Sequence, residues 1–227
     1  LVPGTTYHYC ALASNSVGTS FGAVMTFTTP AALPVVTTAA PTLVTGTSAT
    51  FHGQANPGGA AATGWFRYAT TAPAACDDAF GTRLPATGGT SLGSGTTDQP
   101  FAEAVTGLAA GTTYYVCAIA SNSVGTGVGA VLTFTTPGAA PTVTTTAPTD
   151  VVGDAAMLNG AAVPNGSATT AWFRYAATDP GTCNDSFGTR APTTSGTALG
   201  AGAASVPYGE TVVGLIAGTT YYYCAIA

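Results

Sequence analysis

LAAGTTYYVC, at Leu108–Cys117, decides the fold because it returns at a fixed spacing. Leu1–Cys10 read LVPGTTYHYC and Leu215–Cys224 read LIAGTTYYYC, so the period is 107 residues. No insertion or deletion interrupts this register. An internal repeat of this length predicts an array of like modules, and it decides the architecture before any local pattern does.

The repeat also predicts how the 227 residues divide into modules. Residues 1–30 match only the last part of a repeat, so we expect them to be the C-terminal strands of a preceding or donated module. Residues 31–137 hold one complete module. Residues 138–227 hold a module that lacks its last strand. We therefore expect a segment of a longer protein, or a chain that a neighbour completes.

Charge is scarce, and this excludes some classes of partner. Charged residues are 6 % of the chain, against about 25 % in ordinary soluble domains. Lysine is absent and the net charge is −5, whereas nucleic-acid binding needs clustered Lys or Arg. No apolar run reaches the roughly 18 residues of a membrane span. A surface of Thr, Ser, Gly and Ala is compatible with burial in an assembly, with glycosylation of the hydroxyls, or with a plain secreted spacer.

The local pattern predicts an all-β fold. β-Branched and aromatic residues cluster in short runs, Gly and Pro separate these runs, and no window keeps a helical period. Seven short strands in about 100 residues are typical of an immunoglobulin-like sandwich. The predicted strands of the complete module are Val35–Thr38, Ala49–Ala55, Gly64–Thr70, Thr87–Gly93, Glu103–Leu108, Thr112–Ala120 and Ala130–Thr136.

Two stretches of the module resemble a known family. Leu108–Tyr114, followed by alternating small residues and the turn Ser121–Thr126, resembles the sixth strand of a fibronectin type III domain. Gly53–Gly59 with Trp65–Tyr68 is similar to the second and third strands of the bacterial version. The resemblance implies tandem fibronectin type III β-sandwich modules with a 107-residue repeat. This fold serves as spacer, adhesin and enzyme appendage alike, so it leaves the function open.

A tyrosine and the strand alternation predict which side chains face inward. Tyr7, Tyr114 and Tyr221 can each form a tyrosine corner, with the ring buried and the hydroxyl bonded to upstream backbone. Period-two alternation then sends the side chains beside Tyr114 to alternate faces of the sheet. The expected inward residues are Val116, Ala118, Phe66 and Tyr68, and the expected outward residues are Trp65, Arg67, Tyr115, Cys117 and Ile119.

The five cysteines follow the repeat and predict one disulfide per module. The expected pairs are Cys76–Cys117 and Cys183–Cys224, and Cys10 has no partner within the chain. Each bridge would hold the loop 75–84, or its counterpart, over the outward Trp and Ile, at a gain of roughly 4 kcal/mol. Metal ligands would need shorter spacings, and a nucleophile would need a histidine that recurs with it. Disulfides indicate an oxidising compartment, so we expect an extracellular or cell-surface location.

Several polar residues are weaker candidates for sites. Asp77–Asp78 and Asn184–Asp185 could help to bind calcium, although Asx turns explain them better. Arg83 and Arg190 could pair with those acids or bond loop carbonyls. Two N-glycosylation patterns, at Asn165–Ser167 and Asn184–Ser186, have no match in the previous module. With no lysine, a Lys–Asn cross-link is excluded.

These observations predict a structural protein rather than an enzyme, with no cofactor and no metal. The main hypothesis is a subunit of an extracellular filament whose partner is itself, through a continuous polypeptide or, less favoured, through strand donation. Glycans are a further candidate partner. The alternatives are spacer modules of a secreted enzyme, or an adhesin or carbohydrate-binding region that uses exposed aromatic residues. The candidate aromatic contacts are Phe101, Tyr208 and Tyr222.

Overall fold

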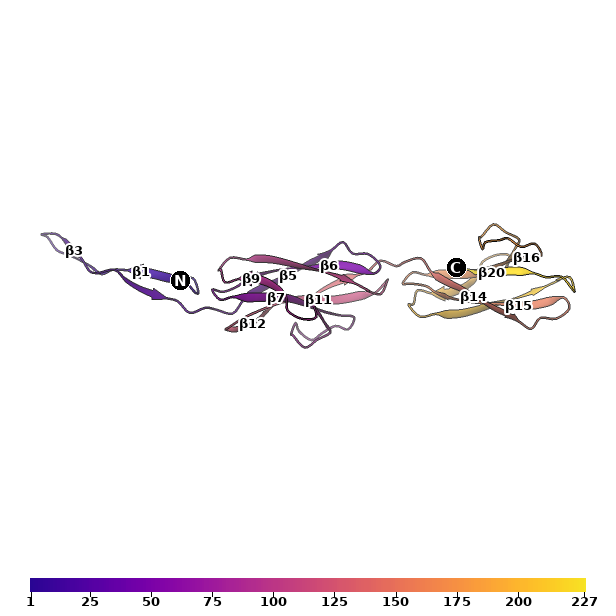
Figure 1. Ribbon diagram of the computed structural model, residues 1–227, viewed down its shortest axis with the longest axis horizontal. Helices are drawn as coiled ribbons and strands as arrows, with labels where there is room; N and C mark the ends of the chain where they lie inside the picture. Colours follow the sequence, from indigo (N-terminus) through magenta and orange to yellow (C-terminus); the bar gives the residue numbers. More distant parts are fainter. The chain divides into compact units, whose positions relative to one another are not determined.

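The computed structural model describes residues 1–227 as an all-β protein of twenty strands without helices (Figure 1). The chain divides into two compact units. One unit contains the first thirteen strands and the other contains the last seven. The tandem fibronectin type III-like sandwich fold that the repeat and the strand pattern predicted is confirmed by the sheet order within these units.

The first sandwich consists of two antiparallel sheets. One sheet has the order β10-β6-β5, and the other has the order β12-β11-β7-β8, with β13 also paired to β11 and β9 to β7. A three-stranded sheet facing a larger one is the fibronectin type III arrangement. The strands are β5 (Val35–Thr42), β6 (Ser48–Asn56), β7 (Ala62–Ala69), β8 (Thr82–Leu84), β9 (Thr90–Gly93), β10 (Gln99–Thr106), β11 (Thr113–Asn122), β12 (Gly125–Val128) and β13 (Leu132–Thr135).

Two details of the first sandwich differ from the predicted strands. The short strand β8 lies inside the predicted covering loop, and the last strand is split into β12 and β13. Gly129 lies at the split, where a Cβ atom would stand 2.4 Å from the Thr38 hydroxyl oxygen. Its nitrogen instead donates to the Ala118 carbonyl at 2.9 Å. Only glycine allows this close approach of the strand to the opposite sheet.

Aromatic rings fill the core of the first sandwich. Phe51 is fully buried, and its ring centroid lies 5.9 Å from that of Phe66, 5.4 Å from that of Tyr68 and 5.6 Å from that of Phe134. The Thr38 hydroxyl accepts a hydrogen bond from the Ala118 nitrogen at 3.0 Å. Thr38 belongs to one sheet and Ala118 to the other, so a buried polar contact also joins the two layers.

The second sandwich repeats this plan in residues 142–226. One sheet has the order β14-β15-β19, and the other has β17-β16-β18 with β20 paired to β16. Burial raises the pKa of Tyr208 to about 12, and its hydroxyl donates to the Ile226 carbonyl at 3.1 Å. The strands are β14 (Thr142–Thr149), β15 (Ala155–Val163), β16 (Thr169–Ala176), β17 (Thr189–Ala191), β18 (Thr197–Gly200), β19 (Val206–Val213) and β20 (Tyr222–Ile226).

Residues 1–30 form two short strand pairs. β1 (Thr6–Tyr9) pairs with β4 (Met25–Thr28), and β2 (Leu12–Ser14) pairs with β3 (Thr19–Phe21). The Tyr7 and Phe27 rings stack at 5.6 Å, the same separation as their repeat counterparts Tyr114 and Phe134. The local geometry of the module is therefore kept in this segment, although most of its large apolar side chains are exposed.

Candidate functional site

The loop 70–81 covers the outer face of β7 and β11 and creates a second, smaller core there. Trp65, Cys117 and Ile119 are buried together, with Cys76, Phe80 and Val131 packed against them. Alternation in β7 and β11 points these three side chains away from the main core. The loop therefore removes from water an apolar patch that the sheet alone would expose. We call these six residues the outer-face cluster.

A disulfide fixes this loop in each sandwich. Cys76 is bonded to Cys117 and Cys183 to Cys224, with Cα–Cα distances of 6.1 and 6.0 Å. The predicted pattern of one disulfide per module is therefore present. Cys10 is free and exposed. Closing a loop of about 40 residues stabilises the fold by roughly 4 kcal/mol in the chain-entropy account.

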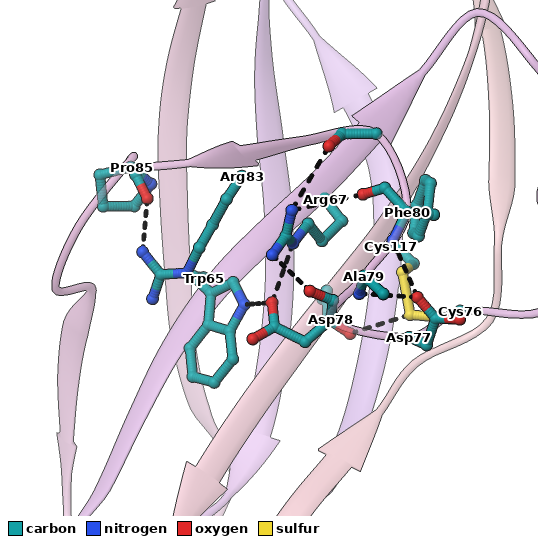
Figure 2. A network of polar contacts seen from close by, with 12 residues as sticks. Trp65, Arg67, Cys76, Asp77, Asp78, Ala79, Phe80, Arg83, Pro85 and Cys117 are labelled. Atoms are coloured by element: carbon teal, nitrogen blue, oxygen red, sulfur yellow. Dashed lines mark hydrogen bonds and ion pairs between the residues drawn. A yellow bond between two sulfur atoms is a disulfide. The ribbon is translucent and has the colours of Figure 1, made fainter.

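One carboxylate oxygen of Asp78, in the covering loop, accepts hydrogen bonds from two side chains of β7. Figure 2 shows the Trp65 indole and the Arg67 guanidinium converging on Asp78. Trp65 Nε1 and Arg67 Nε each donate to Asp78 Oδ1 at 2.8 Å. A second nitrogen of Arg67 donates to the Asp78 carbonyl. The guanidinium therefore ties the strand to both the side chain and the backbone of the loop.

The second sandwich repeats the same contacts on different residues. Trp172 Nε1 and Arg174 Nε donate to Asp185 Oδ1 at 2.8 and 2.9 Å. Hydrogen bonds from Trp172 and then from Arg174 lower the pKa of Asp185 below its ordinary value. Partial burial raises the pKa of Asp78, but the hydrogen bonds from Arg67 and Trp65 outweigh it, so this pKa is also lowered. Both aspartates therefore carry their charge at neutral pH.

The neighbouring aspartate and the second arginine bind backbone. Asp77 Oδ1 accepts from the nitrogens of Ala79 and Phe80 at 2.8 and 2.9 Å, which is an Asx turn. Arg83 lies 4.6 Å above the Trp65 ring and donates to the Pro85 carbonyl at 2.6 Å. Of the two roles expected for Arg83 and Arg190, bonding of loop carbonyls is the one found, because Arg190 likewise donates to the Pro192 carbonyl at 2.7 Å.

The ion pair that forms with the loop aspartate is not the one the sequence suggested, which would have used Arg83 or Arg190. It is made by Arg67 and, in the second sandwich, by Arg174. Alternation had placed Arg67 on the outer face beside Trp65, and the loop was expected to cover that face. Taken together, these two expectations could have predicted an ion pair between Arg67 and a carboxylate of the loop.

No group of three or more His, Cys, Asp or Glu side chains is placed to hold a metal ion. The Asp77 carboxylate, a calcium candidate, is occupied by the Asx turn, and Asp78 by its arginine and tryptophan. His52 Nε2 lies 2.7 Å from the Thr42 hydroxyl, and it is not near a cysteine pair. None of the elements is a helix long and apolar enough to cross a membrane. The described contacts fix a loop and do not form a catalytic constellation.

Phe101 and Tyr208, which the adhesin alternative offered as exposed ligand contacts, do not lie on the surface. Both are buried, and their rings lie 4.9 Å from Phe66 and 5.0 Å from Phe173 in the two main cores. β10 and β19 point these residues inward because alternate side chains of each strand face the core, while the adjacent Pro100, Ala102 and Pro207 are exposed. Tyr222, at 39 % exposure, is the one candidate aromatic of the three on the surface.

The three corner tyrosines lie at equivalent places. The Tyr7 hydroxyl accepts from the Val2 nitrogen at 2.7 Å, and the Tyr221 hydroxyl from the Ile216 nitrogen at 3.1 Å. Tyr114 is buried, and its ring stacks on Phe134. Each tyrosine follows a Gly-containing turn, so the ring holds that turn against the strand.

The second sandwich contains a pocket beside the start of β20. It has a volume of about 250 Å³ and is apolar. Its walls come from β15, β16, β19 and β20, from the turn before β20, and from the end of β14 with the loop that follows it. Among the residues that line the pocket are the large side chains of Leu158, Tyr175, Val212, Ile216, Tyr221 and Tyr223.

No protein-family model and no curated protein matches the sequence. Among solved structures, the chain is similar to the FN1–FN3 domains of chicken CNTN1, with 16 % sequence identity and a TM-score of 0.36. The match covers 99 % of this chain and 70 % of that chain. The two chains do not superpose as wholes at this score, and the strand order described above is what assigns the sandwich fold.

Proposed function

We propose that this chain is a structural part of a filament outside the cell, built from β-sandwich modules joined end to end. The observation that carries the proposal is that the contacts repeated in both sandwiches are structural. Both sandwiches repeat the same disulfide and the same Trp–Arg–Asp contacts, and these contacts stabilise a loop. Function in such folds depends on the site that a module carries, and the contacts repeated here hold a loop in place.

Composition and redox chemistry support the same function. Disulfides in each module are typical of proteins in an oxidising compartment, so we place the chain outside the cell or on its surface. With 6 % charged residues, neighbouring modules meet little electrostatic repulsion. The partner in this proposal is another module of the same kind, in the same polypeptide or in another copy.

The adhesin alternative loses two of its three aromatic contacts, since Phe101 and Tyr208 are core residues. Glycans remain candidate partners as attached groups. Asn184, in one of the two N-glycosylation patterns, is exposed, while the amide nitrogen of Asn165, in the other, donates to the Ala140 carbonyl at 2.7 Å. A glycan on these two positions would decorate one module and not its neighbour.

Electron microscopy of the native material tests the filament proposal. We expect fibres whose axial spacing corresponds to one sandwich module. Dispersed particles of one or a few modules would contradict the proposal. A non-reducing denaturing gel of the same material then separates the two ways of joining modules, because a continuous polypeptide stays long and docked chains separate.

A further inference from the structure

Two core positions carry different residues in the two sandwiches, although the repeat makes them equivalent. Phe51, on β6, corresponds to Leu158, on β15. Val116, on β11, corresponds to Tyr223, on β20. The first sandwich therefore has an aromatic ring on its three-stranded sheet and an aliphatic side chain on the facing sheet, and the second sandwich has the reverse. We call these two residues the ring pair of each sandwich.

In the first sandwich the ring crosses the core from the three-stranded sheet. Phe51 is fully buried, and its ring centroid lies 5.9 Å from that of Phe66 and 5.4 Å from that of Tyr68, both on β7 of the facing sheet. Val116 is 1 % exposed and stands opposite Tyr68 in the ladder between β11 and β7. The two members of the ring pair therefore share Tyr68 as a neighbour.

In the second sandwich the ring crosses the core from the other sheet. The ring centroid of Tyr223 lies 6.2 Å from that of Phe173, which is the counterpart of Phe66. The Tyr223 hydroxyl donates to the Thr146 carbonyl, on β14 of the facing sheet. Leu158 is 4 % exposed and belongs to the core cluster against which Tyr223 packs. Each sandwich thus has one ring that spans its two layers here, and the two rings start from opposite sheets.

The ring pair is the only difference between the two sandwiches on the buried faces of these strands. The buried residues of β6 are, in order, Ala, Phe, Gly and Ala, and those of β15 are Ala, Leu, Gly and Ala. Residues 112–120 read TTYYVCAIA and residues 219–227 read TTYYYCAIA, so these segments differ only at Val116 and Tyr223. Without the ring pair, β11 and β20 would fit either sandwich equally well.

We propose that the ring pair makes each sandwich select its own strand, and so prevents the exchange of β11 and β20 during folding. Exchange of strands between neighbours is a characteristic misfolding of repeat proteins. β20 in the first sandwich would bring a second ring against Phe51, and β11 in the second would leave a cavity beside Leu158. Overpacking and cavities both destabilise a core, so both exchanged sandwiches are less stable than the native ones. The proposal concerns folding and does not rest on the filament.

A double-substitution cycle in the first sandwich tests whether the two positions are coupled. Val116→Tyr alone should lower the folding equilibrium constant at least about tenfold, because Phe51 occupies the space that the new ring needs. Adding Phe51→Leu recreates the ring pair of the second sandwich. The double variant should then be at least about tenfold more stable than the product of the two single effects. Hydrogen exchange at the Ala118 amide measures the first sandwich alone, since this amide donates to Thr38 inside it.

Phe101→Leu is the matched control for Phe51→Leu. It removes a ring from the same core at a position where both sandwiches keep an aromatic residue. Combined with Val116→Tyr, it should give the product of the single effects or a larger loss. If Val116→Tyr alone unfolds the sandwich, Phe51→Leu should restore protection and Phe101→Leu should not. Independent effects at the two positions of the ring pair, an equal recovery with Phe101→Leu, or a double variant that stays unfolded would overturn the proposal.

Oxidative refolding of the full chain tests the exchange itself, because each disulfide records which strand has joined which sandwich. Native folding gives Cys76–Cys117 and Cys183–Cys224. Exchange of the strands gives Cys76–Cys224 and Cys117–Cys183, and mass spectrometry of the digested chain measures the fraction of each pair. All chains carry Cys10→Ala, so that the free thiol does not enter a bridge.

Two variants of the second sandwich are compared in this refolding. Leu158→Phe with Tyr223→Val gives the second sandwich the ring pair of the first, so the exchanged disulfides should increase several-fold over those of the unaltered ring pair. Leu158→Ile with Tyr223→Phe is the matched control, because it changes the same two residues and keeps the ring on β20. It should refold with the native disulfides. Equal fractions of exchanged disulfides in the two variants would overturn the proposal, and the filament proposal would be unaffected.

Discussion

The Asp78 carboxylate accepts a hydrogen bond from the Trp65 indole and forms an ion pair with the Arg67 guanidinium. Through these two contacts it anchors the covering loop. Its pKa is lowered in the folded protein relative to 3.8, the ordinary value. A carboxyl group whose pKa is lowered by folding stabilises the fold above its unfolded pKa, and this contribution is lost as pH falls through the folded pKa. The contribution of Asp78 is therefore complete at neutral pH and decreases as the pH falls below about 4 toward the lowered pKa of the folded state.

Asp78→Asn should accordingly destabilise the first sandwich slightly at neutral pH and have little effect in acid. The amide keeps an acceptor for Trp65 but loses the charge that pairs with Arg67. Because Asp78 is half exposed, we expect a loss below about 1 kcal/mol. Urea unfolding of both forms at neutral pH and at about pH 2.5 measures the difference.

Asp98→Asn is the matched control for that substitution, since Asp98 is an exposed aspartate in a loop of the same sandwich. It should leave the pH dependence of the wild type unchanged. An Asp78→Asn chain whose stability falls with acid as steeply as that of the wild type would show that the carboxylate does not support the loop.

At the scale of strands and loops, the disulfide and the outer-face cluster act on the same element. The double substitution Cys76→Ala with Cys117→Ala should destabilise the first sandwich by roughly 4 kcal/mol, since it frees a loop of about 40 residues. It should also expose Phe80 to chymotrypsin. Chemical unfolding and mass spectrometry of the fragments measure both effects.

Two features of the chain serve as controls for the cysteine substitutions. Cys10→Ala should change neither stability nor cleavage, because Cys10 is free and exposed. The second sandwich keeps its own disulfide, so Phe187, the counterpart of Phe80, should stay as resistant as in the wild type. Equal cleavage at both phenylalanines would mean that the bridge does not hold its own loop.

The strands that the sequence predicted well are those with periodic patterns. Alternation places Phe66 and Val116 inward and Trp65 and Cys117 outward, because one buried core selects one face of each strand. The three-residue strand β8 has no period to read, and its place depends on the disulfide and on Arg67. The inward position of Phe101 was missed because the predicted strand began at Glu103, which left Phe101 outside the alternation that points it to the core.

At the scale of the whole molecule, the two sandwiches share a fold and differ in completeness of packing. Phe51 and Phe134 meet in the first core, whereas Leu158 stands beside an open pocket in the second. A missing buried aromatic side chain lowers stability by about 2 kcal/mol. Within residues 1–227 the second sandwich should therefore be the less stable of the two, although both have a disulfide and the same loop contacts.

Hydrogen exchange on the intact chain tests this difference with matched amides. The Ala118 and Ala225 nitrogens donate at 3.0 Å to Thr38 and Thr145, so the same hydrogen bond protects counterpart positions. In dilute solution, the Ala225 amide should exchange roughly thirtyfold faster than the Ala118 amide. Equal protection in dilute solution would contradict the difference in stability, since the pocket would then have no energetic consequence.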